Sequence, residues 1–239
     1  AIPTYIISRL AKENVGVVLN GDGGDESFAG YQRFFAGVLS ERLPHFIKYF
    51  GSGLFRLMPE FNSPLLLRRA KRFFETVNLS LPERFLRWVS YFPKERLQSL
   101  LRSEYKWLLD EVDILESFNQ YLNRLRGWSV LGKLLYLNIK TALLDDMIVK
   151  MERMSMANSL VARAPFLDKE LMEFAAKLPD GIKLRGWRGK KYKSFVKKAY
   201  RDLLPLEVQG RGKMGFGVPL GSWFRSDLKD YVRDTLLAP

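Results

Sequence analysis

The sequence predicts an α/β chain that is predominantly α-helical after its first strand. Residues 15–19 form a short, valine-rich apolar run that ends in a turn of glycines and acids. A run of this length, bounded by turn residues, is typical of a buried strand. After residue 31 the pattern is helical, and no second strand is predicted. Because a lone strand needs partner strands, we expect the rest of its sheet to lie upstream.

The turn after this strand carries the candidate chemistry. It reads Asn20-Gly21-Asp22-Gly23-Gly24-Asp25-Glu26. Glycines allow positive φ and close approach of the backbone to a ligand. Acids at the C-terminal end of a strand occupy the usual place of a site in an open α/β sheet. A solvated turn is the plain alternative, while the spacing fits neither an EF-hand nor a phosphate loop of the G-x-x-x-x-G-K-[ST] kind.

Composition limits the class of protein. The 239 residues are 47% hydrophobic, which permits a sizeable core. The absence of cysteine excludes disulfides, thiolate metal sites and a cysteine nucleophile, and it fits the cytoplasm. No apolar run approaches the roughly 20 residues that span a bilayer, so no membrane helix is expected. The first residues lack a basic region followed by an apolar one, so no signal peptide is expected there.

The formal net charge of +13 requires an interpretation. Such a charge suits nucleic acid, anionic lipid, a phosphate-bearing ligand or an acidic part of a longer chain. No helix-turn-helix, zinc-finger or RNP motif is present, which favours a nucleotide site over nucleic acid. The single histidine, His45, lies between Pro44 and Phe46 and is interpreted as structural, because no second histidine exists for a triad or a metal site.

The first half of the chain is expected to be a series of helices. Residues 1–14 lead into the strand as a helix, and residues 32–43 form another that Pro44 ends. Residues 65–74 mix bulky apolar residues with cations and predict an amphipathic helix whose cations face water. Breakers divide residues 45–135 into pieces, at Gly51, Gly53, Pro59, Pro64, Pro82, Pro93 and Gly127.

The second half shows a stronger helical pattern. Residues 136–160 are expected to bury one face, made of Leu143, Leu144, Met147, Ile148, Met151 and Met154. Asp168 is expected to cap a helix over 169–178, which ends in a turn at 179–181. A basic helix is expected over 190–203 and a last helix over 223–237, separated by a glycine-rich loop at 210–217.

Three segments resemble the asparagine synthetase family. Residues 18–26, continued by residues 28–31, resemble its V-L-S-G-[DE]-G-x-D-E-x-F-G-G-Y signature. Residues 153–168 resemble a second family segment, and residues 211–216, with Pro219 and Trp223 after them, resemble a third. The segments follow the family's order over most of the chain, so the match is specific although each alone is weak.

The resemblance implies a fold and a domain organisation. It implies that residues 1–239 are part of a PP-loop ATP pyrophosphatase (adenine nucleotide alpha-hydrolase-like) domain. Within it, residues 1–43 hold the strand and nucleotide loop, 44–135 a variable helical region, and 136–239 a helical region with the Lys213 loop. Family members carry a glutaminase domain and a pyrophosphate-binding S-G-G-x-D-S loop upstream. Neither occurs in these residues, so we expect missing N-terminal domains of the same chain, possible homodimers, and a fragment that is inactive alone.

The resemblance also implies a reaction and its site residues. Family members use ATP and Mg²⁺ to adenylate the aspartate side chain, and glutamine-derived ammonia then displaces AMP to give asparagine. Lys213 matches the lysine that stabilises charge in adenylation, Asp22 lines the acyl-AMP site and Asp25 holds Mg²⁺. Nucleotide-binding positions are implied at Asn20, Gly21, Gly23, Gly24 and Arg211.

Departures from the family pattern leave the substrate open. Asn20 replaces serine, Ala29 replaces glycine, Glu152 replaces aspartate, and Val161 replaces the glutamate of S-L-E-x-R. Aspartate or another carboxylate can therefore be the substrate. Relatives on this scaffold close β-lactams or lasso peptides or amidate sugars, which gives an alternative ligase or cyclase. A basic helical module that binds nucleic acid is the non-enzymatic alternative.

Overall fold

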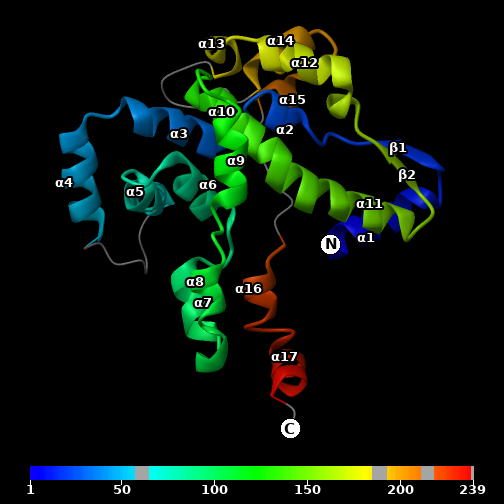
Figure 1. The fold of residues 1–239 in the computed structure, drawn as a ribbon. Coiled ribbons are helices and arrows are strands. Elements are labelled where there is room, and N and C mark those ends of the chain that lie inside the picture. Colours follow the sequence, from blue (N-terminus) through cyan, green and yellow to red (C-terminus); the bar gives the residue numbers. More distant parts are fainter. Residues whose placement is uncertain (57–64, 185–192, 211–217, 238–239) are drawn as a thin grey trace.

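The computed structural model describes residues 1–56, 65–184, 193–210 and 218–237. It is mostly helical (Figure 1). One two-stranded parallel sheet lies at one side of it, near the N-terminal helix and one end of the long central helical run. The prediction of a predominantly helical chain after the first strand is confirmed. Among these residues no helix is long and apolar enough to cross a membrane.

The sheet pairs segments that lie far apart in the sequence. Strand β1 (Val17–Leu19) pairs in parallel with β2 (Val161–Arg163), and the Asn20 N–H continues the pairing by donating to the Arg163 carbonyl at 2.8 Å. The prediction of a single strand is therefore wrong. A strand of three residues is too short to show an alternating pattern, and its pairing is non-local.

The first strand is also less buried than the sequence predicts. The side chains of Val17 and Leu19 are 56% and 75% exposed in the described structure. Before the strand, α1 (Ile2–Lys12) confirms the helix expected over 1–14 and packs on α11 (Val149–Met156). After the strand, the chain enters the short helix α2 (Gly24–Ser27) and then α3 (Gln32–Arg42), which confirms the helix expected over 32–43.

The core lies where α3 meets α6 (Leu81–Val89), α9 (Glu116–Asn123) and α10 (Val130–Asn138). Its buried side chains are Ala29, Phe34, Phe85, Phe118, Leu131, Leu134, Leu135 and Leu137. The rings of Phe85 and Phe118 lie 5.9 Å apart, and Phe34 is fully buried beside Tyr31. This apolar packing fixes the region that follows α2, so the acidic loop is anchored at its C-terminal side.

The helical middle contains several of the pieces that the breakers were expected to separate, while Pro59 and Pro64 lie outside the described residues. The pieces are α4 (His45–Arg56), α5 (Leu65–Thr76), α6 (Leu81–Val89), α7 (Lys94–Leu100), η1 (Ser103–Tyr105), α8 (Leu108–Glu111) and α9 (Glu116–Asn123). The expectation that Gly51 and Gly53 break helices is wrong, because both lie inside α4. A Cβ at Gly51 would overlap the ring of Phe74, so this glycine allows α4 and α5 to approach closely.

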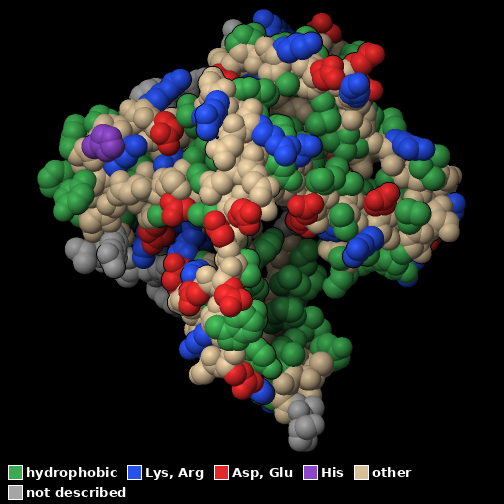
Figure 2. All heavy atoms as spheres, in the orientation of Figure 1, with side chains coloured by type: hydrophobic (Ala, Val, Ile, Leu, Met, Phe, Trp, Pro, Cys, Tyr) green, Lys and Arg blue, Asp and Glu red, His purple; other side chains and the backbone are tan. Residues whose placement is uncertain are grey.

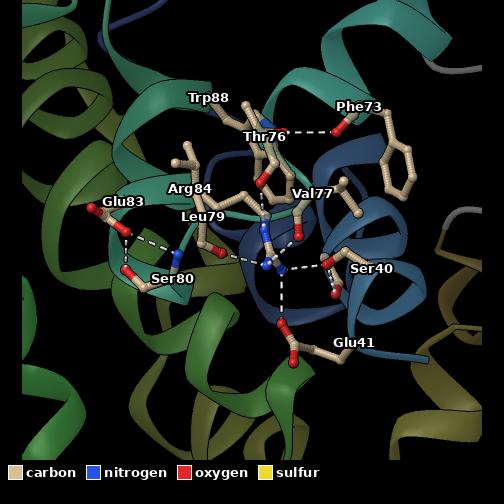
Figure 3. A network of polar contacts seen from close by, with 11 residues as sticks. Ser40, Glu41, Phe73, Thr76, Val77, Leu79, Ser80, Glu83, Arg84 and Trp88 are labelled. Atoms are coloured by element: carbon tan, nitrogen blue, oxygen red, sulfur yellow. Dashed lines mark hydrogen bonds and ion pairs between the residues drawn. The ribbon is translucent and has the colours of Figure 1, made fainter. Parts of the chain in front are cut away.

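A buried arginine joins α3 to the α5–α6 connection (Figure 3). Arg84 is 3% exposed and donates to the carbonyls of Thr76, Val77 and Leu79, to the Ser40 hydroxyl and to the Glu41 carboxylate. The side chain therefore satisfies backbone carbonyls that α5 leaves at its end.

A long helical run crosses the molecule. It consists of α10 (Val130–Asn138), the π-helical segment η2 (Ile139–Ile148) and α11 (Val149–Met156). The single buried face expected over 136–160 is only partly correct, since Leu143 is buried whereas Leu144 is 49% exposed. The π segment bonds residue i to i+5, which changes the angle between successive side chains and rotates the face.

The last third of the chain contains short helices. They are η3 (Pro165–Leu167), α12 (Lys169–Lys177), α13 (Asp180–Lys183), α14 (Ser194–Ala199), α15 (Leu206–Gly210), α16 (Leu220–Trp223) and α17 (Lys229–Leu236). Asp168 caps α12 as predicted, accepting from the Leu171 N–H at 3.0 Å. Figure 2 shows apolar side chains over the lower part of the molecule, where α16 and α17 lie.

Three expectations for this part need correction. The turn expected at 179–181 is the start of α13, with Pro179 at its N-cap. The basic helix expected over 190–203 spans only 194–199 in the described residues, and the helix expected over 223–237 is interrupted between α16 and α17. The glycine-rich loop, except for Gly210 in α15, lies outside the described residues.

Candidate functional site

The acidic loop leaves β1 as a tight, internally bonded turn. The Asn20 side-chain oxygen accepts from the Asp22 N–H at 3.2 Å, and the Gly24 N–H donates to the Gly21 carbonyl at 3.4 Å. Gly23 has φ +88° and forms the N-cap of α2. Asn20 therefore orders the loop through its own side chain, and the chain reverses into α2 at a glycine with positive φ.

The loop rests on η3, which follows β2. A Cβ at Gly23 would overlap the Leu167 side chain, and a Cβ at Gly24 would lie 3.2 Å from the Phe166 ring. The same Phe166 ring meets Phe28 edge to face, with centroids 6.2 Å apart. The glycines thus allow the first and second family segments to pack directly against each other.

Gly23→Ala is expected to lower the free energy of unfolding by about 2–3 kcal/mol, because it forces alanine into left-handed backbone and against η3. Gly21→Ala is the matched control. A Cβ at Gly21 meets nothing within 4 Å, so this change is expected to cost less than about 0.5 kcal/mol. Chemical denaturation of the two variants and the wild type measures the difference. Equal losses in both variants would contradict the packing argument.

Asp25 is a buried carboxylate of the site. The residue is 9% exposed, and its Oδ1 lies 2.9 Å from the Lys193 Nζ, at the N-terminal side of α14. The Gly30 N–H donates to the Asp25 carbonyl at 2.7 Å, and a Cβ at residue 30 would overlap the Asp25 carboxylate. Gly30 therefore leaves the space that the Asp25 carboxylate occupies.

Asp22 lies closer to the surface and beside α11. Its side chain is partly buried, and burial raises the pKa of the carboxyl group, while the nearby Lys150 opposes that shift. Burial disfavours the charged form of a carboxylate, and a neighbouring cation favours it. Asp22 and Asp25 thus present two carboxylates in different surroundings on one turn.

Glu26 is a site residue that the sequence analysis did not select. It is 1% exposed and accepts a hydrogen bond from the Tyr31 hydroxyl at 2.6 Å. Burial, followed by this hydrogen bond, raises the pKa of Tyr31. The guanidinium of Arg33 lies 4.1 Å from the Tyr31 ring centre and donates to the Asn138 side chain, and burial lowers its pKa. Glu26 and Tyr31 lie five residues apart within the family signature, and this spacing is the sequence signal that could have indicated their contact.

A cavity of about 570 Å³ borders the other side of α2. Glu26 and Ser27 line it together with side chains of α10, α12 and α13, among them Tyr136 and Lys183. Lys183 is 4% exposed, and burial lowers the pKa of its amine. Sequence patterns gave no indication of this cavity, because its walls come from several elements that lie apart in the sequence.

The structure brings together one group of the predicted site residues. Asn20, Gly21, Asp22 and Gly23 lie on the loop between β1 and α2, and Gly24 and Asp25 form the first two residues of α2. Arg211 and Lys213 lie outside the described residues. Lys193, which the sequence analysis did not select, meets Asp25 across the fold. No sequence pattern indicated that contact, because the two residues come from distant segments.

The surroundings of Asp25 are compatible with a bound metal ion. Within the described residues, no three Asp, Glu or His side chains group together as metal ligands. Mg²⁺ commonly uses only one or two carboxylates, with phosphates and water as its other ligands. Asp25 offers one such carboxylate, whose Oδ1 pairs with the Lys193 ammonium group in this structure. A single-carboxylate site of that kind fits these residues.

One protein family covers the whole chain, including the residues of this site. The family model for asparagine synthase matches residues 1–239, and the chain belongs to this family. The resemblance stated from the three segments is confirmed. No solved structure matches the chain.

Curated relatives extend well beyond the matched region. The chain is 31% identical over 240 residues to "Asparagine synthetase [glutamine-hydrolyzing] 1" of Bacillus subtilis, with 99% of the chain and 36% of that protein covered. It is 30% identical over 227 residues to a putative asparagine synthetase of Mycobacterium tuberculosis, with 94% of the chain and 33% of that protein covered. The chain thus spans about a third of the length of these relatives.

Proposed function

We propose that this chain is part of an ATP-dependent amidotransferase that converts aspartate to asparagine with glutamine-derived ammonia. The observation that carries the proposal is the pair of carboxylates, Asp22 and Asp25, on the family loop at the end of β1. Asp25 faces a cation and Asp22 is half-buried beside Lys150, which suits a site for phosphates and an acyl group. In this proposal the parallel pair β1–β2 belongs to a larger PP-loop sheet, completed by upstream segments.

The proposed reaction has two steps. An oxygen of the substrate carboxylate attacks the α-phosphorus of ATP, which forms the acyl-AMP and releases pyrophosphate. Ammonia then attacks the acyl carbon, AMP leaves with the bond electrons, and the nitrogen releases one proton to give the neutral amide. When bound, Mg²⁺ supplies positive charge that favours departure of pyrophosphate.

The residues of this chain have distinct proposed roles. Asp25 holds the metal, and Asp22 lines the acyl-AMP site. The loop backbone at Gly21, Gly23 and Gly24 meets the nucleotide, while Asn20 keeps that backbone ordered through its bond to the Asp22 N–H. Lys213 stabilises charge on the phosphates as a compact donor, and Arg211 supports its loop.

ATP–pyrophosphate exchange by the full-length protein tests the proposal. Exchange that requires aspartate and is lost in Lys213→Ala supports both the reaction and the role of the lysine. Absence of exchange with every carboxylate, in a folded protein that binds ATP, would reject adenylation. This assay tests adenylation separately from the ammonia step, because the exchange of pyrophosphate into ATP does not need ammonia.

A related ligase or cyclase on the same scaffold is the second candidate. It is favoured by Asn20, whose side-chain oxygen is used within the loop, and by Val161, an apolar residue that is 43% exposed at β2. Exchange that requires a carboxylate other than aspartate would select this candidate. On the face drawn in Figure 2, Lys and Arg side chains are interspersed with acidic and apolar ones, so that face gives the nucleic-acid alternative no added support.

A further inference from the structure

We propose that Lys193 is a built-in counter-ion of Asp25, which occupies the carboxylate in the metal-free protein and is displaced when a divalent cation binds there. This inference rests on the proposed function, because it takes Asp25 as the metal-binding carboxylate. It adds the N-cap residue of α14, which controls how readily the site accepts its metal.

The contact between the two charges is close and partly shielded from water. The Lys193 Nζ lies 2.9 Å from the Asp25 Oδ1, with side chains 32% and 12% exposed. A carboxylate this buried is costly without a positive neighbour. Lys193 supplies that neighbour in the described structure.

The difference in exposure indicates which partner moves. Asp25 is fixed in α2, packed against Gly30 and bonded through its carbonyl. Lys193 has a long flexible side chain with a third of its surface in solvent. Its ammonium group can therefore move into water, whereas the carboxylate has no comparable freedom.

The helix that carries Lys193 is anchored by a different residue. The ring of Phe195 stacks on Phe28 with centroids 6.0 Å apart and planes 13° apart, and it lies 6.1 Å from the Phe174 ring. These contacts hold α14 against α2 and α12 independently of the ion pair. Displacement of the lysine therefore needs rotation of one side chain, and α14 stays in place.

A divalent metal ion and the Lys193 ammonium group compete for the Asp25 carboxylate, because both are positively charged. A divalent ion on the Asp25 carboxylate and an ammonium group at 2.9 Å from the same oxygen would repel each other strongly. The metal therefore binds in exchange for the lysine, and part of its binding energy is used to displace it. Removing the lysine is expected to tighten metal binding.

Binding of Mn²⁺ to the full-length protein without nucleotide, followed by electron paramagnetic resonance, tests this inference. Lys193→Met is expected to bind Mn²⁺ about tenfold more tightly than the wild type. Lys198→Met makes the same change of charge at an exposed position of α14 and is expected to leave the affinity within about twofold. Asp25→Asn is expected to remove the site.

The outcomes separate this inference from the proposed function. Equal Mn²⁺ affinity in the wild type and Lys193→Met, with loss in Asp25→Asn, overturns the counter-ion and leaves the metal role of Asp25 standing. Unchanged binding in Asp25→Asn rejects that metal role and the inference with it. Equal tightening in Lys193→Met and Lys198→Met means a general effect of charge, which also overturns the inference.

Displacement of Lys193 can also be measured in the wild-type protein, from the reactivity of its amine. A short pulse of acetic anhydride labels exposed lysine amines, and mass spectrometry locates the label. Adding Mg²⁺ is expected to raise acetylation of Lys193 at least about twofold, because the displaced amine loses its carboxylate partner, while Lys198 stays unchanged. Unchanged labelling of Lys193 at a Mg²⁺ concentration that saturates the site contradicts displacement.

Discussion

Asp25→Asn is expected to lower ATP–pyrophosphate exchange by about 100-fold or more, because the neutral amide cannot hold a metal ion at the reacting phosphates. Asparagine has nearly the shape of aspartate, so it fits the space beside Gly30 and keeps an oxygen toward Lys193. The loss is therefore expected in the reaction while the fold is preserved. Exchange rates and circular dichroism of the full-length variant measure the two effects separately.

Asp110→Asn is the matched control for this prediction. Asp110 is an exposed aspartate on α8, where its carboxylate pairs with Lys94, and it lies outside the acidic loop. Its replacement is expected to leave the exchange rate within about twofold of the wild type, as for surface ion pairs generally. Exchange by Asp25→Asn at the rate of this control would remove Asp25 from the reaction.

Local signals predicted much of the chain. The valine run, the glycines of the acidic loop and the capping aspartate at 168 each act within a few residues, so β1, the turn into α2 and the start of α12 could be located from the sequence. Gly51 shows the limit of such signals. From the local sequence, a glycine inside a helix cannot be distinguished from one that ends a helix. Only the ring of Phe74, on the facing helix, shows why a glycine is needed at residue 51.

The parts that sequence patterns missed depend on distant segments. Strand β2 is a strand because β1 lies beside it, and Lys193 belongs to the site because Phe195 holds α14 against Phe28. Neither contact has a signal within its own segment. The loop that was predicted to bind the nucleotide could be found because its residues are consecutive, whereas the cation beside it could be found only from the fold.

Arg84→Met is expected to lower the stability of the α3–α6 region by about 3–5 kcal/mol, because it leaves buried acceptors without their donor. Arg84 donates to three backbone carbonyls, at distances between 2.6 and 3.2 Å, and to the Ser40 hydroxyl (Figure 3). Methionine keeps the apolar stem and removes only the guanidinium. Native-state hydrogen exchange on peptides from α3 and α6 measures the change within the full-length protein.

A second variant separates the carbonyl contacts from the ion pair of Arg84. The Glu41 carboxylate lies 2.8 Å from Arg84, but its side chain is 42% exposed. Water screens such a carboxylate, so Glu41→Gln is expected to cost less than about 1 kcal/mol. If Glu41→Gln cost as much as Arg84→Met, the ion pair would be the main contribution and the carbonyl contacts a minor one. A large loss in Arg84→Met alone means that the arginine stabilises the fold by satisfying the backbone between α5 and α6.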